Sequence, residues 1–322
     1  MPEGHTLHRL AQSLDLAFAG TTPSVSSPQG PFAEGAALLN GRQVTEATAY
    51  GKHLFVEFSG EQWLNVHLGL IGKFSVDRIT GYASVPPVWG QVRLRMVNDD
   101  YLADLRGATI VQVVTPDEAA ATVARLGPDP LRADADPGRA WAKISRSGRT
   151  IAELLMDQAA LAGVGNVYRC EVLFRHRVSP FRPGREIRRR TWDLLWADLV
   201  RLMPLGVAFN QILTMDDQIE EAERLVADGA VPELTSTWTD SARWLGRGPA
   251  GVVAEVAAES GVVEDVARDA DLEEEGDGGG MERRFWVYRR AGEPCRVCGS
   301  RIRTQVVAGR NPFWCGRCQR RR

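Results

Sequence analysis

Four cysteines near the C-terminus constrain the fold more than any other feature of the chain. They form two Cys-x2-Cys pairs, Cys295/Cys298 and Cys315/Cys318, separated by sixteen residues. Two such pairs are the ligand pattern of a tetrahedral zinc site. Because four thiolates occupy all four positions, no position remains for water, and we expect one structural Zn²⁺. Four unrelated thiols would not explain two evenly built pairs.

The residues between the two pairs predict a small ribbon of two short strands joined by a tip. Ile302, Gln305 and Val306 precede the run Arg-Asn-Pro-Phe-Trp at 310–314. A unit of this size cannot build a core alone, so the metal would hold it together. Residues 281–322 hold twelve Arg and two Glu, and we expect Arg310, at the tip, to reach a phosphate.

The net charge of −2 conceals two regions of opposite sign. Residues 216–277 carry 18 Asp and Glu against four Arg, a net charge of −14, which leaves +12 for the rest. A basic body of this kind predicts a nucleic-acid partner. No run approaches 18 apolar residues, so we expect no membrane span. Five cysteines, four of them clustered, indicate a reducing compartment, and we expect the cytoplasm.

In the first part of the chain a helix is followed by a sheet. Leu7, Leu10, Ala11 and Leu14 recur at helical spacing, Gly20 would end that helix, and residues 21–35 read as a loop. Three segments then alternate as strands, at 52–58, 62–68 and 91–97. No helix-length pattern separates them, which favours an antiparallel sheet or sandwich.

Helical patterns dominate the second part. We expect a short helix over 116–125, a break over 126–131, helical segments around 151–155 and 167–174, a long helix over 185–203 and an acidic helix over 216–228. The domain boundaries expected from these changes are 1–134 for a sheet domain, 135–235 for a helical domain, 236–281 for an acidic linker or insertion and 282–322 for the zinc ribbon.

The N-terminus offers a candidate nucleophile. If Met1 is removed, Pro2 carries a free secondary amine, with the carboxylate of Glu3 beside it. An α-amino group titrates at roughly 7.7–8.0, and its neutral form attacks aldehyde carbons to give an iminium ion. Taken alone, these residues fit an ordinary start of translation better.

Five short motifs, in this order along the chain, carry a resemblance to a known family. They are Pro2-Glu3-Gly4, Gly51-Lys52, His67-Leu-Gly69, Gly163-Val-Gly-Asn-Val-Tyr168 and Arg310-x4-Cys-x2-Cys-Gln319. Together they resemble the formamidopyrimidine-DNA glycosylase/endonuclease VIII family, and the Pro-Glu-Gly start favours the endonuclease VIII branch. The resemblance implies an α+β multidomain fold, with an N-terminal β-sandwich and flanking helices, a helix–two-turns–helix domain and a C-terminal zinc ribbon.

The resemblance also implies an activity. Members of this family are bifunctional DNA glycosylases and AP lyases of base excision repair, and for this chain we expect oxidised bases, with pyrimidines favoured. A Schiff base on the N-terminal proline would precede strand cleavage by β- or β,δ-elimination. The partner would be damaged double-stranded or single-stranded DNA, bound by a monomer. One alternative is a non-catalytic DNA-binding or regulatory paralogue; another is a zinc-ribbon module that binds a protein through the acidic segment 216–280.

Transferred position by position, the resemblance assigns roles to five residues. Pro2 is the nucleophile, Glu3 the general acid, and Lys52 a cation near the phosphate that assists catalysis. Asn166 and Arg310 bind the same phosphate region. The plainer alternatives are a surface lysine for Lys52 and a turn or helix-capping residue for Asn166.

Further assignments concern the gap that an extruded nucleotide leaves. Leu70 is aligned with the family's wedge loop and would fill the gap, although core packing is the alternative. Arg106 would face the orphaned base. The chain has Thr6 where the family often has a second Glu, which changes how the opened sugar and damaged base are held. We expect Cys170 to be a core residue and the five histidines to be structural.

Overall fold

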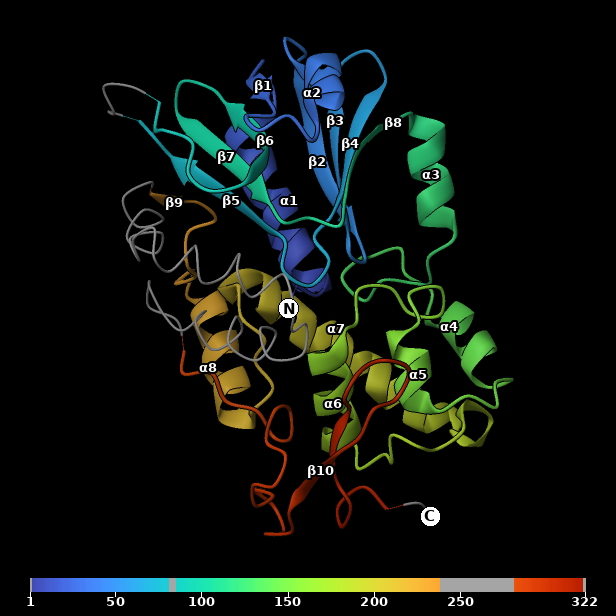
Figure 1. The fold of residues 1–322 in the computed structure, drawn as a ribbon. Helices are drawn as coiled ribbons and strands as arrows, with labels where there is room; N and C mark the ends of the chain where they lie inside the picture. Colours follow the sequence, from blue (N-terminus) through green and yellow to red (C-terminus); the bar gives the residue numbers. More distant parts are fainter. Residues whose placement is uncertain (1, 81–84, 238–280, 321–322) are drawn as a thin grey trace.

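The computed structural model describes residues 2–80, 85–237 and 281–320. Its N-terminal half is a sandwich of two sheets that enclose an apolar core (Figure 1). One sheet has the strand order β2-β3-β4-β8, and the other has the order β1-β6-β7-β5-β9. The strands are β1 (Ser24–Ser26), β2 (Val44–Tyr50), β3 (His53–Phe58), β4 (Gln62–His67), β5 (Lys73–Arg78), β6 (Val92–Val97), β7 (Tyr101–Arg106), β8 (Ile110–Val114) and β9 (Ser236–Thr237).

The expected antiparallel sandwich is confirmed. Strand pairs are antiparallel throughout the two sheets, except for β9, which runs parallel to β5. The three strands predicted from alternation begin and end within one residue of their observed bounds. Val92, Leu94 and Met96 are buried on β6, as the alternation required.

Helix α1 (Gly4–Phe18) begins near the N-terminus in the middle of the molecule and runs into the sandwich (Figure 1). Leu7, Leu10, Ala11 and Leu14 are buried in the sandwich core, which confirms the predicted face. Two further helices, α2 (Ala33–Leu39) and α3 (Pro116–Ala124), flank the sheets. The start of α1 therefore lies where the sandwich meets the helical half of the chain.

The prediction of a loop over 21–35 was wrong in part. Residues 24–26 form the edge strand β1, which pairs with β6, and α2 begins at Ala33. The backbone N–H of Val25 donates to Asn40 Oδ1 at 2.9 Å, and Val25 is the one buried residue of the strand. Because polar serines flank a single apolar residue, the strand has no alternation that the sequence could reveal.

The second half of the chain is helical. Its elements are α4 (Pro137–Ile144), α5 (Ile151–Met156), α6 (Asn166–Arg175), a 3₁₀ turn (Gly184–Glu186), α7 (Arg189–Phe209) and α8 (Asp216–Ala227). Trp192, Leu195, Leu199 and Leu202 of α7 face the core, as predicted.

The predicted bounds of the long helix, 185–203, were wrong at both ends. Its first residues form the separate 3₁₀ turn, with Ile187 extended, and the helix continues through Pro204 to Phe209. Proline removes one helical hydrogen bond and normally ends a helix. Here Leu205, Gly206, Val207 and Phe209 beyond it are all buried, so tertiary packing overrides the local signal.

Part of the acidic segment is folded onto the body. The acidic helix predicted over 216–228 is present as α8, and its Asp217 pairs with Arg284 Nη2 at 2.5 Å. Glu223 pairs with Arg201 at 2.6 Å. The region expected to be a linker begins with β9, and its residues 238–280 lie outside the described residues. No described helix is long and apolar enough to cross a bilayer.

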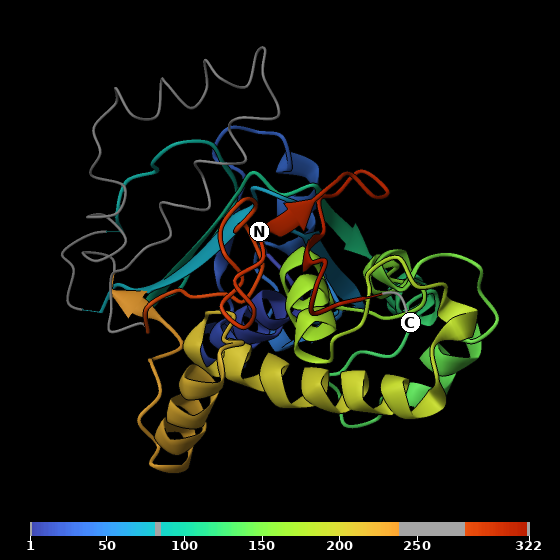
Figure 2. The same cartoon turned by 90° about the horizontal axis from the view of Figure 1, so that it is seen from below.

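The C-terminal ribbon lies against α6, as Figures 1 and 2 show. Its strands are β10 (Ile302–Thr304) and β11 (Phe313–Cys315), and the tip between them includes Arg310. The N–H of Phe313 donates to Cys170 Sγ at 3.3 Å, and Cys170 is 2% exposed, which confirms it as a core residue. The ribbon and helical half thus share one core.

Candidate active site and zinc centre

The carboxylate of Glu3 is the centre around which the candidate site is built. Its Oε2 accepts from the N–H of Gly165 at 2.6 Å and its Oε1 from the N–H of Val167 at 2.8 Å. These donors stand at the N-terminus of α6, where unpaired N–H groups and the helix dipole favour an anion. Glu3 is fully buried. A residue of the N-terminus is therefore fixed by a turn more than 160 positions away in the chain.

Glycines allow this close approach of two backbone segments. The N–H of Gly4 donates to the carbonyl of Gly163 at 2.8 Å, and an added Cβ on Gly4 would lie 2.8 Å from Gly163 Cα. A Cβ on Gly165 would overlap the side chain of Glu3. Gly163 and Gly165 must therefore lack side chains, because Glu3 and Gly4 occupy the adjacent space.

Gly165→Ala is therefore expected to lower single-turnover nicking of an abasic-site duplex by about 10²-fold, because the methyl group displaces Glu3 by a fraction of its own diameter. Gly148→Ala is the matched control, since its Cβ would meet only Arg185 Nη1, at 3.3 Å. Thermal melting of both variants reports on folding. Unchanged nicking in a folded Gly165→Ala protein would contradict the assigned role of this contact.

Three cations converge on the same region. Lys52, Arg169 and Arg310 influence one another electrostatically, and Lys52 also interacts with Glu3. Burial lowers the pKa of Lys52, and the Glu3 carboxylate opposes this effect. Burial likewise raises the pKa of Glu3, while Lys52 and the two backbone donors lower it. Clustered cations beside a single carboxylate indicate a site for a further anion.

Asn166 contacts the ribbon tip at Asn311, the residue that follows Arg310. Asn166, the first residue of α6, donates from Nδ2 to the carbonyl of Asn311 at 3.1 Å. Its Oδ1 accepts from Arg169. The side chain thus joins the glycine-rich turn to the ribbon tip rather than capping its own helix, since Gly165 is the N-cap residue.

Leu70 does not pack in the core. It is 44% exposed, and the next residue, Ile71, is 59% exposed. Both lie in the loop between β4 and β5, which we call the wedge loop (residues 68–72). The alternative of core packing is therefore excluded, and Ile71 is a second apolar candidate that the motif did not reveal.

Arg106 ends β7 beside the wedge loop. Its Nη2 donates to Asp104 Oδ2 at 2.8 Å and its Nε to the carbonyl of Trp89 at 3.2 Å. An added Cβ on the following Gly107 would lie 3.3 Å from the carbonyl of Ile71. The guanidinium group is consequently held between Asp104 and the carbonyl of Trp89, while the backbone that follows it lies against the wedge loop.

Thr6 lies on the first turn of α1, where its Oγ1 is 3.3 Å from His5 Nε2. Burial lowers the pKa of His5 to about 3, so this histidine is neutral at physiological pH. Its ring meets that of Tyr168 edge-on, with 5.5 Å between the centroids. The Thr6 hydroxyl and the neutral His5 imidazole are thus both uncharged, whereas a second glutamate would bring a negative charge to this turn.

Asp129 is a supporting residue that the sequence did not reveal. It is fully buried and accepts from His8 Nε2 and from the N–H of Gly51, both at 2.7 Å. Because Gly51 precedes Lys52, this carboxylate fixes the turn that carries the lysine. The sequence showed only a break at 126–131, and a single aspartate within it has no distinguishing signal.

Glu171 fixes the approach to the ribbon in a similar way. It is fully buried in α6 and accepts from the N–H groups of Trp286, Val287 and Tyr288 at 2.8–2.9 Å. Thr214 Oγ1 donates to the same carboxylate at 2.7 Å. Burial raises its pKa, and the four donors lower it. This clamp places residues 286–288, and with them the start of the ribbon, on the helical half.

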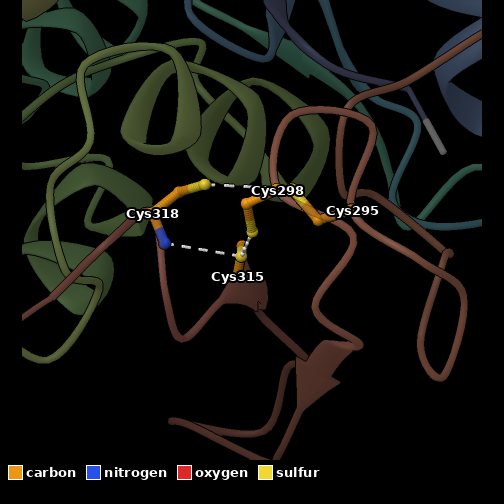
Figure 3. Close-up of side chains that lie close together, drawn as sticks. All are labelled: Cys295, Cys298, Cys315 and Cys318. Carbon is orange, nitrogen blue, oxygen red and sulfur yellow. Dashed lines mark hydrogen bonds between the residues drawn. The ribbon is translucent and has the colours of Figure 1, made fainter.

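The four ribbon cysteines converge as the spacing predicted (Figure 3). Their sulfur atoms all lie within 4.8 Å of one another, with Cys298 and Cys315 at 3.4 Å and Cys295 and Cys318 at 3.9 Å. Zn–S bonds of about 2.3 Å in a tetrahedron place sulfurs about 3.8 Å apart, so the donor set fits zinc. The ribbon holds one structural Zn²⁺, which fixes the hairpin that presents Arg310.

Comparison with known families divides the chain into three matching parts. The N-terminal domain of formamidopyrimidine-DNA glycosylase matches residues 1–111, and the H2TH domain of the same enzyme matches residues 126–217. The zinc finger found in FPG and IleRS matches residues 292–321. All three parts follow the order of the sandwich, the helical half and the ribbon.

Whole-chain relatives agree with this division. Endonuclease 8 1 of Mycobacterium tuberculosis is 44% identical over 319 residues, which cover 99% of this chain and 100% of the relative. DNA-(apurinic or apyrimidinic site) lyase Nei2 of Mycolicibacterium smegmatis is 27% identical, and 99% of each chain is covered. The Fpg protein of Lactococcus lactis, solved with DNA containing N7-benzyl-Fapy-dG, has the same fold, with a TM-score of 0.68 at 18% identity over 99% of this chain and 100% of that one.

Fold, site and relatives together define a DNA-binding repair enzyme of base excision repair, a DNA glycosylase that is also an AP lyase. The chain belongs to the formamidopyrimidine-DNA glycosylase/endonuclease VIII family, in its endonuclease VIII-like branch. The alternative of a module without catalytic activity is thereby set aside.

Proposed function

We propose that this enzyme excises oxidised pyrimidines through a Schiff base on Pro2 and then nicks the strand by elimination. The observation that supports the proposal is the clasp of Glu3 by the Gly165 and Val167 N–H groups, because Glu3 follows Pro2 in the chain and interacts electrostatically with Lys52. A covalent mechanism needs a nucleophile and an acid held together at one carbon. Pro2 and Glu3 are adjacent in the chain and meet this requirement.

The chemistry follows from these groups. The lone pair of the Pro2 nitrogen forms a bond to C1′ while the bond from C1′ to the damaged base breaks. The proton lost from the amine leaves with the base. Glu3 then donates a proton to O4′, which opens the sugar ring and leaves a C1′=N⁺ iminium ion. A stacked duplex hides C1′, so the nucleotide must first be extruded.

Strand cleavage uses the same intermediate. The iminium ion acidifies the C2′–H bond, and loss of that proton expels the 3′ phosphate as the C3′–O bond breaks. A second elimination at C4′ would break the C5′–O bond, and water would then release the sugar and restore the amine. The ammonium of Lys52 and the guanidinium of Arg310 stabilise the phosphate that leaves. Asn166 binds the same phosphate region as Arg310.

The lesion preference is tested with matched duplexes that carry an oxidised pyrimidine or an oxidised purine at one position. We expect a higher single-turnover excision rate for the pyrimidine, with product ends that distinguish β- from β,δ-elimination on a denaturing gel. Faster excision of the purine would contradict the pyrimidine assignment without affecting the covalent mechanism.

We further propose that the enzyme acts as a monomer in the cytoplasm on duplex or single-stranded DNA. Metal-binding cysteines and a buried Cys170 suit a reducing compartment. We also propose that the acidic segment 216–280 binds a protein partner; in its described part, Asp216, Asp217 and Glu223 already pair with arginines. Light scattering that found a stable dimer would overturn the monomer.

A further inference from the structure

An exposed apolar surface lies beside the wedge loop and has no role in the proposed function. It consists of Val85, Val88 and Trp89, which are 50%, 40% and 36% exposed. We call residues 85–89, which precede β6, the tryptophan loop. Single exposed apolar residues are ordinary, but three in five consecutive positions indicate a contact surface.

The backbone of the tryptophan loop is fixed by two arginines. Arg95 donates from Nη1 to the carbonyl of Pro86 at 2.8 Å and from Nη2 to that of Pro87 at 3.3 Å. Arg106 donates from Nε to the carbonyl of Trp89 at 3.2 Å. The two prolines also restrict their own φ angles. The apolar side chains are therefore presented to solvent from a rigid backbone.

A single buried carboxylate holds both arginines. Asp104, which is fully buried, accepts from Arg95 Nε at 2.7 Å and Nη2 at 2.8 Å, and from Arg106 Nη2 at 2.8 Å. Arg95 and Asp104 are directly opposite each other on β6 and β7. Burying charged groups is costly unless each is paired and hydrogen-bonded. Here the paired charges fix the shape of an exposed loop.

The tryptophan loop is continuous with the candidate DNA-binding surface. Arg106 contacts Trp89 on one side, and Gly107 lies against the carbonyl of Ile71 on the other. Leu70 and Ile71 are both exposed there. Two exposed apolar loops thus lie on either side of Arg106, and exposed aromatic side chains on a nucleic-acid-binding surface stack on bases.

We propose that Trp89, supported by Val88, contacts the undamaged strand opposite the extruded nucleotide and packs against the orphaned base or its neighbour. The proposal rests on the proposed function, because only extrusion opens the stack at this point and exposes a base face. The wedge from Leu70 and Ile71 fills the gap, and Trp89 holds the strand that remains. Continuity of this surface with the wedge loop favours DNA over a second copy of this chain or another protein as its occupant.

The test compares Trp89→Ala with the wild-type enzyme on a tetrahydrofuran abasic-site analogue, in a duplex and in a single strand. Trp89→Ala is expected to bind the duplex about tenfold more weakly and the single strand equally well. Trp89→Phe keeps an aromatic face and should stay within about threefold of wild type. Leu194→Ala, which removes a 50% exposed side chain on α7, is the matched control and should change neither affinity.

A fluorescent 2-aminopurine placed opposite the analogue reports the contact directly. Its emission on binding should be quenched by the wild-type protein and less so by Trp89→Ala. Equal duplex affinities, or equal losses on duplex and single strand, would overturn the proposal. So would a change in oligomeric state with no change in DNA affinity, which would assign the surface to a second copy.

Failure of this proposal is distinguishable from failure of the proposed function. Borohydride trapping on a single-stranded abasic oligonucleotide needs Pro2 but not the opposite strand, so Trp89→Ala should trap as well as wild type. An adduct absent with the wild-type enzyme on both single-stranded and duplex abasic DNA would reject the proposed function whatever Trp89 does. A normal adduct with no loss of duplex affinity would reject the Trp89 contact alone.

Discussion

Inserting one glycine between Met1 and Pro2 is expected to lower excision and nicking by at least about 10⁴-fold. The inserted residue converts the Pro2 nitrogen from a secondary amine into a tertiary amide, which has no lone pair available for attack on C1′. All side chains remain present, and the free α-amine now belongs to a residue that precedes Pro2. Single-turnover kinetics on a lesion-bearing duplex, followed on a denaturing gel, measures the loss.

Two controls separate chemistry from folding in this experiment. Affinity of the glycine-inserted protein for an uncleavable abasic-site analogue should stay within about threefold of wild type, since phosphate and wedge contacts persist. Cys170→Ala alters a buried residue of α6 away from the amine and should retain most activity. Excision by the inserted chain at a rate near that of wild type would place the nucleophile elsewhere.

Glu3→Gln is expected to lower base excision by about 10²–10⁴-fold, the usual contribution of a general acid. Glutamine also sets an amide NH₂ against one of the two backbone N–H groups at Gly165 and Val167. Trapping on a preformed abasic site should be affected less, because part of that sugar is already an open aldehyde. The comparison of the two substrates therefore separates ring opening from the later steps.

The pKa of Glu3 also determines how the excision rate should change with pH. Burial raises the pKa of Glu3, so the acid form persists to higher pH, and wild-type excision should fall as pH rises through that pKa. Deprotonation of the Pro2 amine, at roughly 7.7–8.0 in model peptides, acts in the opposite direction and gives a bell-shaped profile. Glu3→Gln should lose the descending limb.

Glu153→Gln is a matched control for this pH profile. Glu153 also accepts a backbone N–H at a helix N-terminus, from Thr150 at 2.9 Å, but it lies outside the site. Its substitution should leave both limbs unchanged. An identical bell-shaped profile in Glu3→Gln would show that another group is the acid.

Much of the fold could be predicted from periodicity and spacing because those signals are local. The cysteine pairs defined the ribbon, alternation defined β3, β4 and β6, and the buried stripe defined α1. The failures occurred where tertiary contacts override local preference. Pro204 is accommodated within α7 by the packed residues that follow it, and β1 is a strand only because β6 lies next to it.

The site was less accessible to sequence reasoning. Motifs named Pro2, Glu3 and Lys52, but nothing in the chain indicates that Glu3 is bound by the N-terminus of α6. Asp129, Glu171 and Asp104 position other residues through buried carboxylates, and such residues resemble any other aspartate or glutamate in a sequence. Their roles depend on distance in space, which neither spacing nor composition encodes.

Mapping of the trapped adduct tests most directly whether the Pro2 nitrogen captures the sugar. Enzyme and abasic-site DNA are reduced with borohydride, digested with nuclease and protease, and sequenced by mass spectrometry. We predict a deoxyribose remnant on the α-nitrogen of a peptide that begins at Pro2, with Met1 absent. A remnant on Lys52, or an unmodified N-terminal peptide in a fully active preparation, would contradict the claim.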